Sequence, residues 1–211
     1  MMPSTGSPPG APRRFFLLAY QMPAKPTAGR VAVWRNLKKI GAVYVQDSVC
    51  VLPDTMTQRR EVAPVLERID VGGGRYHLLP LGRLPAGEEE KLRALFVEQA
   101  AQHYREIVEN CEVNFVKEIE FEHFRRNYTY EEAEEIRMEF DKICTWFNRV
   151  EKRDWFGAPN REEAWGWLRR CERLLEEFER RVFEVNATDT REPPVGLRVV
   201  SAPGDGSPRP A

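Results

Sequence analysis

Basic side chains without acidic neighbours are the clearest chemical feature of this 211-residue chain. Residues 1–46 contain no Asp or Glu, although the whole chain, with 32 basic and 33 acidic residues, carries a net charge of only −1. Lys and Arg neutralise phosphates and release counterions, so such a segment favours a nucleic-acid partner. The candidate DNA-binding residues are Arg13, Arg14, Arg30, Arg35, Lys38 and Lys39. The alternative is a solvated helix face whose lysines complement the helix C-terminus.

Four cysteines could supply a reactive thiol, but their spacing argues against one. Cys50, Cys111, Cys144 and Cys171 lie far apart without a CxxC motif, which indicates a reducing, cytoplasmic compartment. A reactive thiol needs exposure and a nearby cation that lowers its pKa. Only Cys50 lies near the basic segment, and strand alternation directs it toward the core. We therefore expect the cysteines to pack as small hydrophobes.

Motifs for metals, cofactors and membranes are weak or missing in the sequence. Glu120 and His123 form one ExxH pair, whereas di-iron carboxylate bundles use two such pairs and two further Glu residues. Glycines 72–74 follow a helical segment and precede a strand, the reverse of a dinucleotide-binding turn. No apolar run approaches the roughly 20 residues that a membrane span needs. We expect a protein that is not an enzyme, with no metal, cofactor or membrane partner.

Short strand and helix patterns alternate over residues 13–84, the part that must position the basic residues. Residues 27–41 indicate a helix that turns Arg35, Lys38 and Lys39 outward. Its expected apolar stripe is Val31, Trp34, Leu37 and Ile40. AVYVQ and VCVLP indicate two strands joined at Asp47-Ser48 by a tight turn or a bulge.

The remaining elements of this part complete a recognisable order. FFLLAYQM indicates the first strand, and RYHLLPLGRL the last. Asp54-Thr55 can cap a second helix, in which Pro64 suggests a kink or a late start. The order β-α-β-β-α-β predicts a ferredoxin-like α+β domain with both helices on one face of an antiparallel sheet.

Residues 85–185 carry helical periodicity and predict an antiparallel three-helix bundle. The first helix should break near Arg125–Tyr128, and Thr129 with Glu132 forms a capping box for the second. Large aromatic residues should form either an exposed binding or dimerisation face or a sealed bundle end: Trp146, Trp155, Phe156, Trp165 and Trp167. The tails, residues 1–12 and 186–211, are rich in Pro, Gly and Ser and are expected to be disordered, and VGLRVV within the second tail has the pattern of a short strand.

Several stretches in this order resemble the N-terminal domain of the chromate-resistance regulator ChrB. They are FFLLAYQMPAKP, RVAVWRNLKKIGAVYVQDSVCVLPD, the glycine run, YTYEEAEEI and RDWFGAP, spread over residues 15–183. The resemblance implies a transcriptional regulator that binds its own promoter and responds to chromate. We expect it to form a dimer through the sheet. It also implies a second, C-terminal domain, for which we expect no counterpart here, since a short Pro-rich tail follows Val182.

The first domain is also similar to ferredoxin-like domains of two other groups. One is the phenylacetate-operon repressor PaaX, and the other is the small CRISPR-associated nuclease of spacer integration. That nuclease carries an acidic metal ligand where the first strand ends, but here the strand ends Ala19-Tyr20-Gln21-Met22. Metal-dependent cleavage is therefore disfavoured. The alternatives to a DNA-binding regulator are a module that partners a separate chromate-sensing protein, and an oxyanion-handling enzyme that uses a thiol and nearby arginines.

Overall fold

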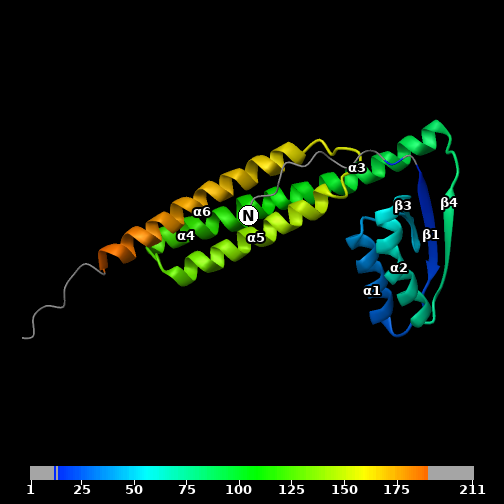
Figure 1. The fold of residues 1–211 in the computed structure, drawn as a ribbon, viewed down its shortest axis with the longest axis horizontal. Helices are drawn as coiled ribbons and strands as arrows, with labels where there is room; N and C mark the ends of the chain where they lie inside the picture. The colour runs from blue at the N-terminus through cyan, green and yellow to red at the C-terminus, as the bar shows by residue number, and fades with distance from the viewer. Residues whose placement is uncertain (1–11, 13, 190–211) are drawn as a thin grey trace, which may run out of the picture.

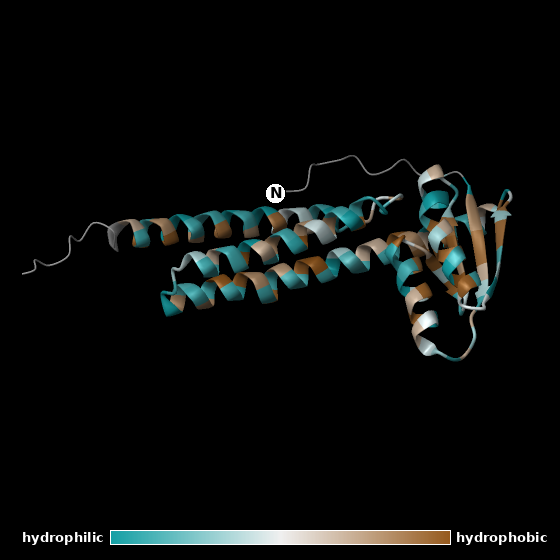
Figure 2. Cartoon of the chain, turned by 60° about the horizontal axis from the view of Figure 1, so that its bottom comes forward, coloured by the Kyte–Doolittle hydropathy of each residue, from teal (hydrophilic) through white to brown (hydrophobic). Residues whose placement is uncertain are grey.

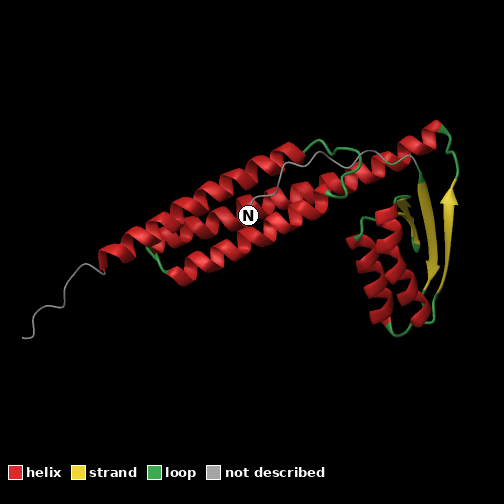
Figure 3. Cartoon of the chain, viewed as in Figure 1, coloured by secondary structure: helices red, strands yellow, loops and turns green. Residues whose placement is uncertain are grey.

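The computed structural model describes residue 12 and residues 14–189. Arg13, most of the N-terminal tail and the C-terminal tail with VGLRVV lie outside the described residues. A sheet with two helices occupies one end of an elongated molecule, and long helices run away from it to the other end (Figure 1; Figure 3). The mixed α+β class with a helical C-terminal region is confirmed.

The sheet has four strands in the spatial order β2-β3-β1-β4, with every neighbouring pair antiparallel. The chain enters through β1 (Phe15–Gln21), α1 (Thr27–Lys39), β2 (Val43–Gln46), β3 (Val49–Pro53), α2 (Met56–Val71) and β4 (Arg75–Leu81). One face of the sheet packs against α1 and α2 through a core that includes Phe16, Leu18, Leu52, Val62 and Ile69. Strand β1 lies inside the sheet and pairs with β3 on one side and β4 on the other. This interior position explains its almost uninterrupted apolar sequence.

Of the two alternatives considered at Asp47-Ser48, the structure has the tight turn. The two residues form the turn, with Ser48 at a left-handed φ of 60°. A register shift between Tyr44 and Gln46 adds an irregularity just before it. The hairpin therefore bends at its tip, beside the end of β1.

Helix α1 is rotated relative to the prediction. Val33 and Leu37 are its buried residues, whereas Trp34 is 48% exposed. The expected stripe was wrong for Trp34 because residues at strict i+3 spacing drift about 60° backward per step around a helix. Such a stripe cannot keep one face on the sheet for three turns, and the straighter pair Val33 and Leu37 makes the contact instead. Helix α2 runs through Pro64, so the late start was also wrong, and the hydroxyl of Thr55 caps it by accepting from the Gln58 N–H at 3.1 Å.

The helical part begins with α3 (Ala86–Glu109), which continues through a π-helix, η1 (Asn110–Phe115), into α4 (Val116–Arg125). After a sharp turn come α5 (Tyr130–Glu151) and α6 (Arg161–Asp189), the latter reaching past residue 185, where we expected the helices to end. Thr129 accepts from the Glu132 N–H at 3.2 Å, as the capping box predicted. Buried side chains from all these helices form a common core, and the helices run alongside one another (Figure 1). None of the helices described here is both long and apolar enough to cross a membrane.

A second apolar cluster joins the other face of the sheet to the helices. Phe96 of α3 stacks on Phe15 with ring centroids 5.8 Å apart and meets Trp155 edge-on at 5.5 Å. Val43 and Val51 of the sheet belong to the same cluster, and the strands are largely hydrophobic in Figure 2. Trp155 is buried, and Trp146, Trp165 and Trp167 pack against the helical core. These aromatic residues are therefore divided between two clusters and do not form one exposed face, and apart from Trp155 they are only partly buried.

Candidate nucleic-acid interface

Two groups of cations that lie far apart in the sequence meet where α1 ends beside the end of α5. Arg35, Lys38 and Lys39 line a pocket of about 720 Å³ together with Arg149 and Arg153. A neighbouring pocket is lined by Lys39, Lys152 and the same two arginines. We call the six residues the basic junction: Arg35, Lys38, Lys39, Arg149, Lys152 and Arg153.

Arg153 holds the two parts of the junction together. Its Nη1 donates to the Lys38 and Lys39 carbonyl oxygens at 3.0 and 2.7 Å, and its Nε donates to the Arg149 carbonyl at 2.7 Å. These oxygens belong to the last turns of α1 and α5, which lack intrahelical donors and carry partial negative charge. Burial lowers the pKa of Arg153, but an arginine remains charged at any physiological pH.

Gly41 makes the close approach of Arg153 possible. It has a left-handed φ of 86°, and a Cβ at this position would lie 2.9 Å from Trp155 Cη2 and 3.0 Å from Arg153 Cδ. The sequence indicated Gly41 only as the stop of a helix. The structure gives it a second role, because the turn after α1 packs directly under the α5 connection.

The other cations of the basic junction differ in how free they are. Arg35, Lys39, Arg149 and Lys152 are exposed, and none of them forms an ion pair with the described part of the chain. Lys38 is half-buried, donates to Gln99 Oε1 at 3.2 Å and lies 5.4 Å from the centre of the Tyr44 ring. The four exposed side chains are therefore available to an anion. Lys38 is less available, because it is half-buried and already donates to Gln99.

Of the two acidic groups that line these pockets, Glu98 is engaged by a cation outside the junction, whereas Glu61 keeps its charge, which acts on Arg153. Glu98 pairs with Arg105 at 2.6 Å, and Glu61 accepts from Gln58 at 3.2 Å. His103 also lines the larger pocket, where burial and then the charge of Arg153 lower its pKa. His103 is thus neutral at pH 7, and the positive charge of the junction comes from Lys and Arg alone.

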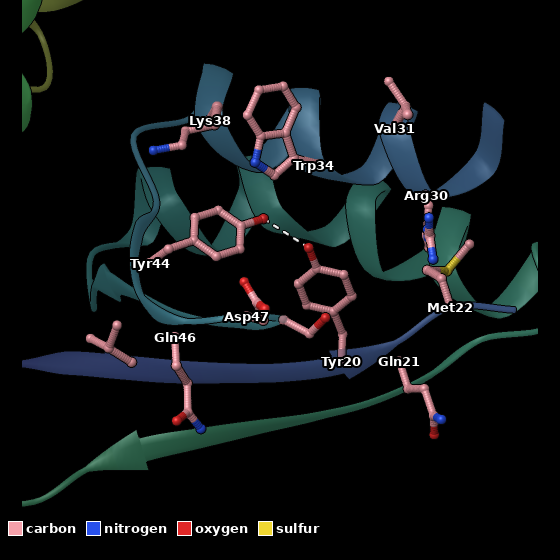
Figure 4. A pocket seen from close by; sticks show the side chains of 12 residues that line it. Tyr20, Gln21, Met22, Arg30, Val31, Trp34, Lys38, Tyr44, Gln46 and Asp47 are labelled. Carbon is pink, nitrogen blue, oxygen red and sulfur yellow. Dashed lines mark hydrogen bonds between the residues drawn. The ribbon is translucent and has the colours of Figure 1, made fainter. Parts of the chain in front are cut away.

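The remaining predicted DNA-binding residues lie elsewhere. Arg30 is on α1 but lines a different pocket, on the side of the helix that faces the β2–β3 hairpin (Figure 4). Arg14 is exposed near Asp54 and the end of β4, and Arg13 is outside the described residues. Sequence reasoning missed Arg149, Lys152 and Arg153. The run RVEKRD carried a signal, but nothing local pairs it with a helix more than 100 residues earlier.

The cysteines give no reactive group beside these cations. All four are free and buried. Burial raises the pKa of Cys50 to about 12, and nearby Lys38 offsets this only in part. The Cys50 thiol is therefore protonated at neutral pH.

A cluster of three glutamates in the helical part has the geometry to hold a cation. Oxygens of Glu118, Glu122 and Glu132 lie within 4.8 Å of one another. Protein partners already account for this arrangement, because Asn127 donates to Glu122 at 2.6 Å and to Glu132 at 3.1 Å, and Arg125 pairs with Glu122 at 3.3 Å. His123, the other half of the ExxH pair, bonds to Tyr128 Oη at 3.0 Å and packs on Phe178. The ExxH histidine is thus part of the packing at this end of the helices.

Comparison with known proteins identifies the chain. A search of curated proteins finds no match. Residues 30–189 match the family described as "Protein ChrB, N-terminal", a range that begins in α1 and ends with α6, and so contains the whole basic junction. The chain therefore belongs to the ChrB N-terminal family.

Proposed function

We propose that this chain is a DNA-binding transcriptional regulator linked to chromate resistance. Membership of the ChrB N-terminal family is consistent with such a role. The observation that carries the proposal is the basic junction, where cations from α1 and α5 converge. In this proposal, the βαββαβ part is a ferredoxin-like domain that presents α1, and the helical part is an antiparallel bundle that adds the α5 cations.

The physical argument rests on uncompensated charge. Arg35, Lys39, Arg149 and Lys152 are exposed and have no acidic partner among the described residues, so a phosphate backbone can replace their counterions. Two helix ends held together by Arg153 form a fixed surface, which lowers the ordering cost of binding. Such contacts position a protein on DNA without specifying a base sequence.

The test is a salt series of binding to the DNA upstream of the gene that encodes this protein, followed by fluorescence anisotropy. Each phosphate contact contributes roughly 0.9 to the slope of log K against log salt. Lys39→Glu with Arg149→Glu should abolish binding at moderate salt and leave the circular dichroism spectrum unchanged. The matched control is Arg75→Glu with Lys117→Glu, which changes charge equally at exposed sites outside the junction. Equal loss in both double variants, or none in the first, would refute this surface.

A second candidate is a module that binds a separate sensor protein. Its supporting observation is no longer the tryptophan cluster, which is largely covered, but exposed aromatic side chains toward the far end of α4. Phe124 is 85% exposed and Phe121 is 50% exposed. A stable complex with a chromate-responsive protein that is lost in Phe121→Ser with Phe124→Ser, together with no salt-dependent DNA affinity, would favour this candidate.

Two further parts of the proposal concern assembly and catalysis. A dimer would double the basic surface, and sedimentation of the free chain at several concentrations tests it. An oxyanion-handling reaction through a thiol is the least supported role, because the cysteines are buried. Replacing all four by Ala or Ser without loss of a chromate response would remove that role.

A further inference from the structure

A pocket of about 730 Å³ opens on the side of α1 that faces the tip of the β2–β3 hairpin (Figure 4). Arg30, Trp34 and Lys38 line it at i, i+4 and i+8 on one face of α1. The end of β1 contributes Tyr20, and β2 contributes Tyr44. Its volume lies within the usual range of small-molecule sites.

The aromatic part of the pocket is a pair of phenols below an indole. Tyr20 and Tyr44 hydroxyls lie 2.8 Å apart and are hydrogen-bonded to each other. Figure 4 shows Trp34 above this pair, between Lys38 and Arg30. Nearly half of Trp34 remains exposed, so its ring is open to a flat ligand. Any nucleic-acid base can stack on an exposed aromatic ring, because every base has a flat π-face.

The polar part of the pocket has unused hydrogen-bonding capacity. A pair of hydroxyls shares one proton in its mutual bond, so the second O–H of the tyrosine pair remains free to donate. Burial raises the pKa of both tyrosines, which keeps both phenols neutral donors at pH 7. Asp47 lines the pocket without a hydrogen-bond partner among the described residues, whereas Figure 4 shows the side chains of Gln21 and Gln46 directed away from Trp34 and the tyrosine pair.

The charges select the kind of ligand. Arg30 has no ion pair with the described chain, and with Lys38 it outweighs the single carboxylate of Asp47. The side of the pocket formed by Arg30 and Lys38 therefore favours a negatively charged group of the ligand. A simple aromatic acid would leave Asp47 without a donor, whereas a nucleotide offers N–H and ribose O–H donors as well as a phosphate.

We infer that this pocket binds a single nucleotide, with its base against Trp34 and its phosphate at Arg30. The nucleotide is either a free mononucleotide or an unpaired unit of a single-stranded nucleic acid. Bases stacked inside a duplex cannot enter such a pocket without being turned out of the helix. The inference therefore does not depend on duplex binding by the basic junction, and either can fail alone.

Calorimetric titration of the full chain tests the inference, with AMP, GMP, CMP and UMP as probes and inorganic phosphate as a comparison. We expect one-to-one binding of at least one mononucleotide, and much weaker binding of phosphate alone. Trp34→Leu should weaken the nucleotide about tenfold or more, because stacking is lost. Arg30→Gln should weaken it severalfold. The matched controls, Phe124→Leu and Arg75→Gln, change an exposed aromatic and an exposed cation outside the pocket and should have no effect.

A short single-stranded oligonucleotide distinguishes the two sources. Tighter binding than any mononucleotide, with the same dependence on Trp34, assigns the pocket to single-stranded nucleic acid. Equal or weaker binding assigns it to the free nucleotide. No saturation by any probe up to about 10 mM, or affinity unchanged in a folded Trp34→Leu protein, would overturn the inference.

Discussion

Replacing Arg153 by methionine should weaken the whole fold, because this side chain joins two segments that are distant in the sequence. Arg153 donates to the carbonyl oxygens of Lys38, Lys39 and Arg149 over distances of 2.7 to 3.0 Å. Methionine preserves most of the aliphatic packing against Gly41 and removes all three hydrogen bonds. The expected loss is therefore electrostatic and not one of volume.

The size of the loss follows from the partial exposure of the site. A hydrogen bond from a charged donor contributes about 1.5–3 kcal/mol when its partners cannot be rehydrated. Here the carbonyls lie at helix ends, where water can replace part of each bond, so we expect a total of about 2–3 kcal/mol. With a urea m-value of about 2 kcal/mol/M, the unfolding midpoint should fall by about 1–1.5 M.

Urea unfolding of the full chain, followed by circular dichroism, measures this shift. Arg153→Lys retains the charge but not the forked geometry, and should lose about half as much. Arg149→Met is the matched control, because its exposed side chain makes no hydrogen bond within the described chain and only its carbonyl accepts from Arg153. That variant should stay within about 0.5 kcal/mol of the parent. If Arg153→Met did the same, the proposed bridge between α1 and α5 would be refuted.

Four more substitutions examine separate parts of the fold. Gly41→Ala should lower the free energy of unfolding by about 1–2 kcal/mol because of the left-handed backbone at this position, and further because the new Cβ displaces Trp155. Gly166→Ala is the control: it lies at an open position in α6 and should raise the free energy of unfolding by about 0.5–1 kcal/mol. Thermal unfolding compares the two variants. Thr129→Ala should cost about 1 kcal/mol through loss of the α5 cap, and an unchanged urea midpoint would contradict that role. Asp54→Asn should destabilise the protein modestly at pH 7, because Arg59 lowers the pKa of Asp54 in the folded state. That contribution is present above the unfolded pKa of about 3.9 and is lost as the pH falls through the lower folded value, so the two proteins should converge in acid; a constant difference would argue against the ion pair.

The sequence predicted those parts of the fold whose causes are local. The caps at Thr55 and Thr129 were predicted because a hydroxyl at a helix start bonds to an N–H three residues on, within one short segment. The bend at Asp47-Ser48 was predicted for a similar reason. The burial of all four cysteines followed from their place on apolar stripes.

The candidate site was only half predictable, because its cause is tertiary. Arg35, Lys38 and Lys39 share a helix face by spacing alone, but their meeting with Arg149 and Arg153 depends on how the helices dock on the sheet. That docking is set by Phe96, Phe15 and Trp155, three aromatic residues whose contact no local pattern encodes. The prediction that Trp34 is buried was wrong for a local reason, because an i+3 stripe drifts around the helix and the i+4 pair Val33 and Leu37 faces the sheet instead.

The π-helix between α3 and α4 has a consequence for how this protein tolerates change. Buried residues recur at intervals of four from Phe96 through Tyr104, and again from Cys111 through Phe115 to Ile119. In a regular α-helix, that interval drifts by about 40° per step, so the stripe would gradually turn toward solvent. The wider turn at Asn110–Phe115 absorbs the drift as one surplus residue. Removing one residue there would convert the wide turn into a regular α-turn and leave α4 close to its present orientation. Removing a residue at 116–118, in the regular part of α4, would instead rotate the rest of the helix by about 100°, carrying Ile119 outward and Glu122 away from Asn127. The rod is thus sensitive to its length in residues along the regular helices, and least sensitive to the loss of one residue at the π-helix.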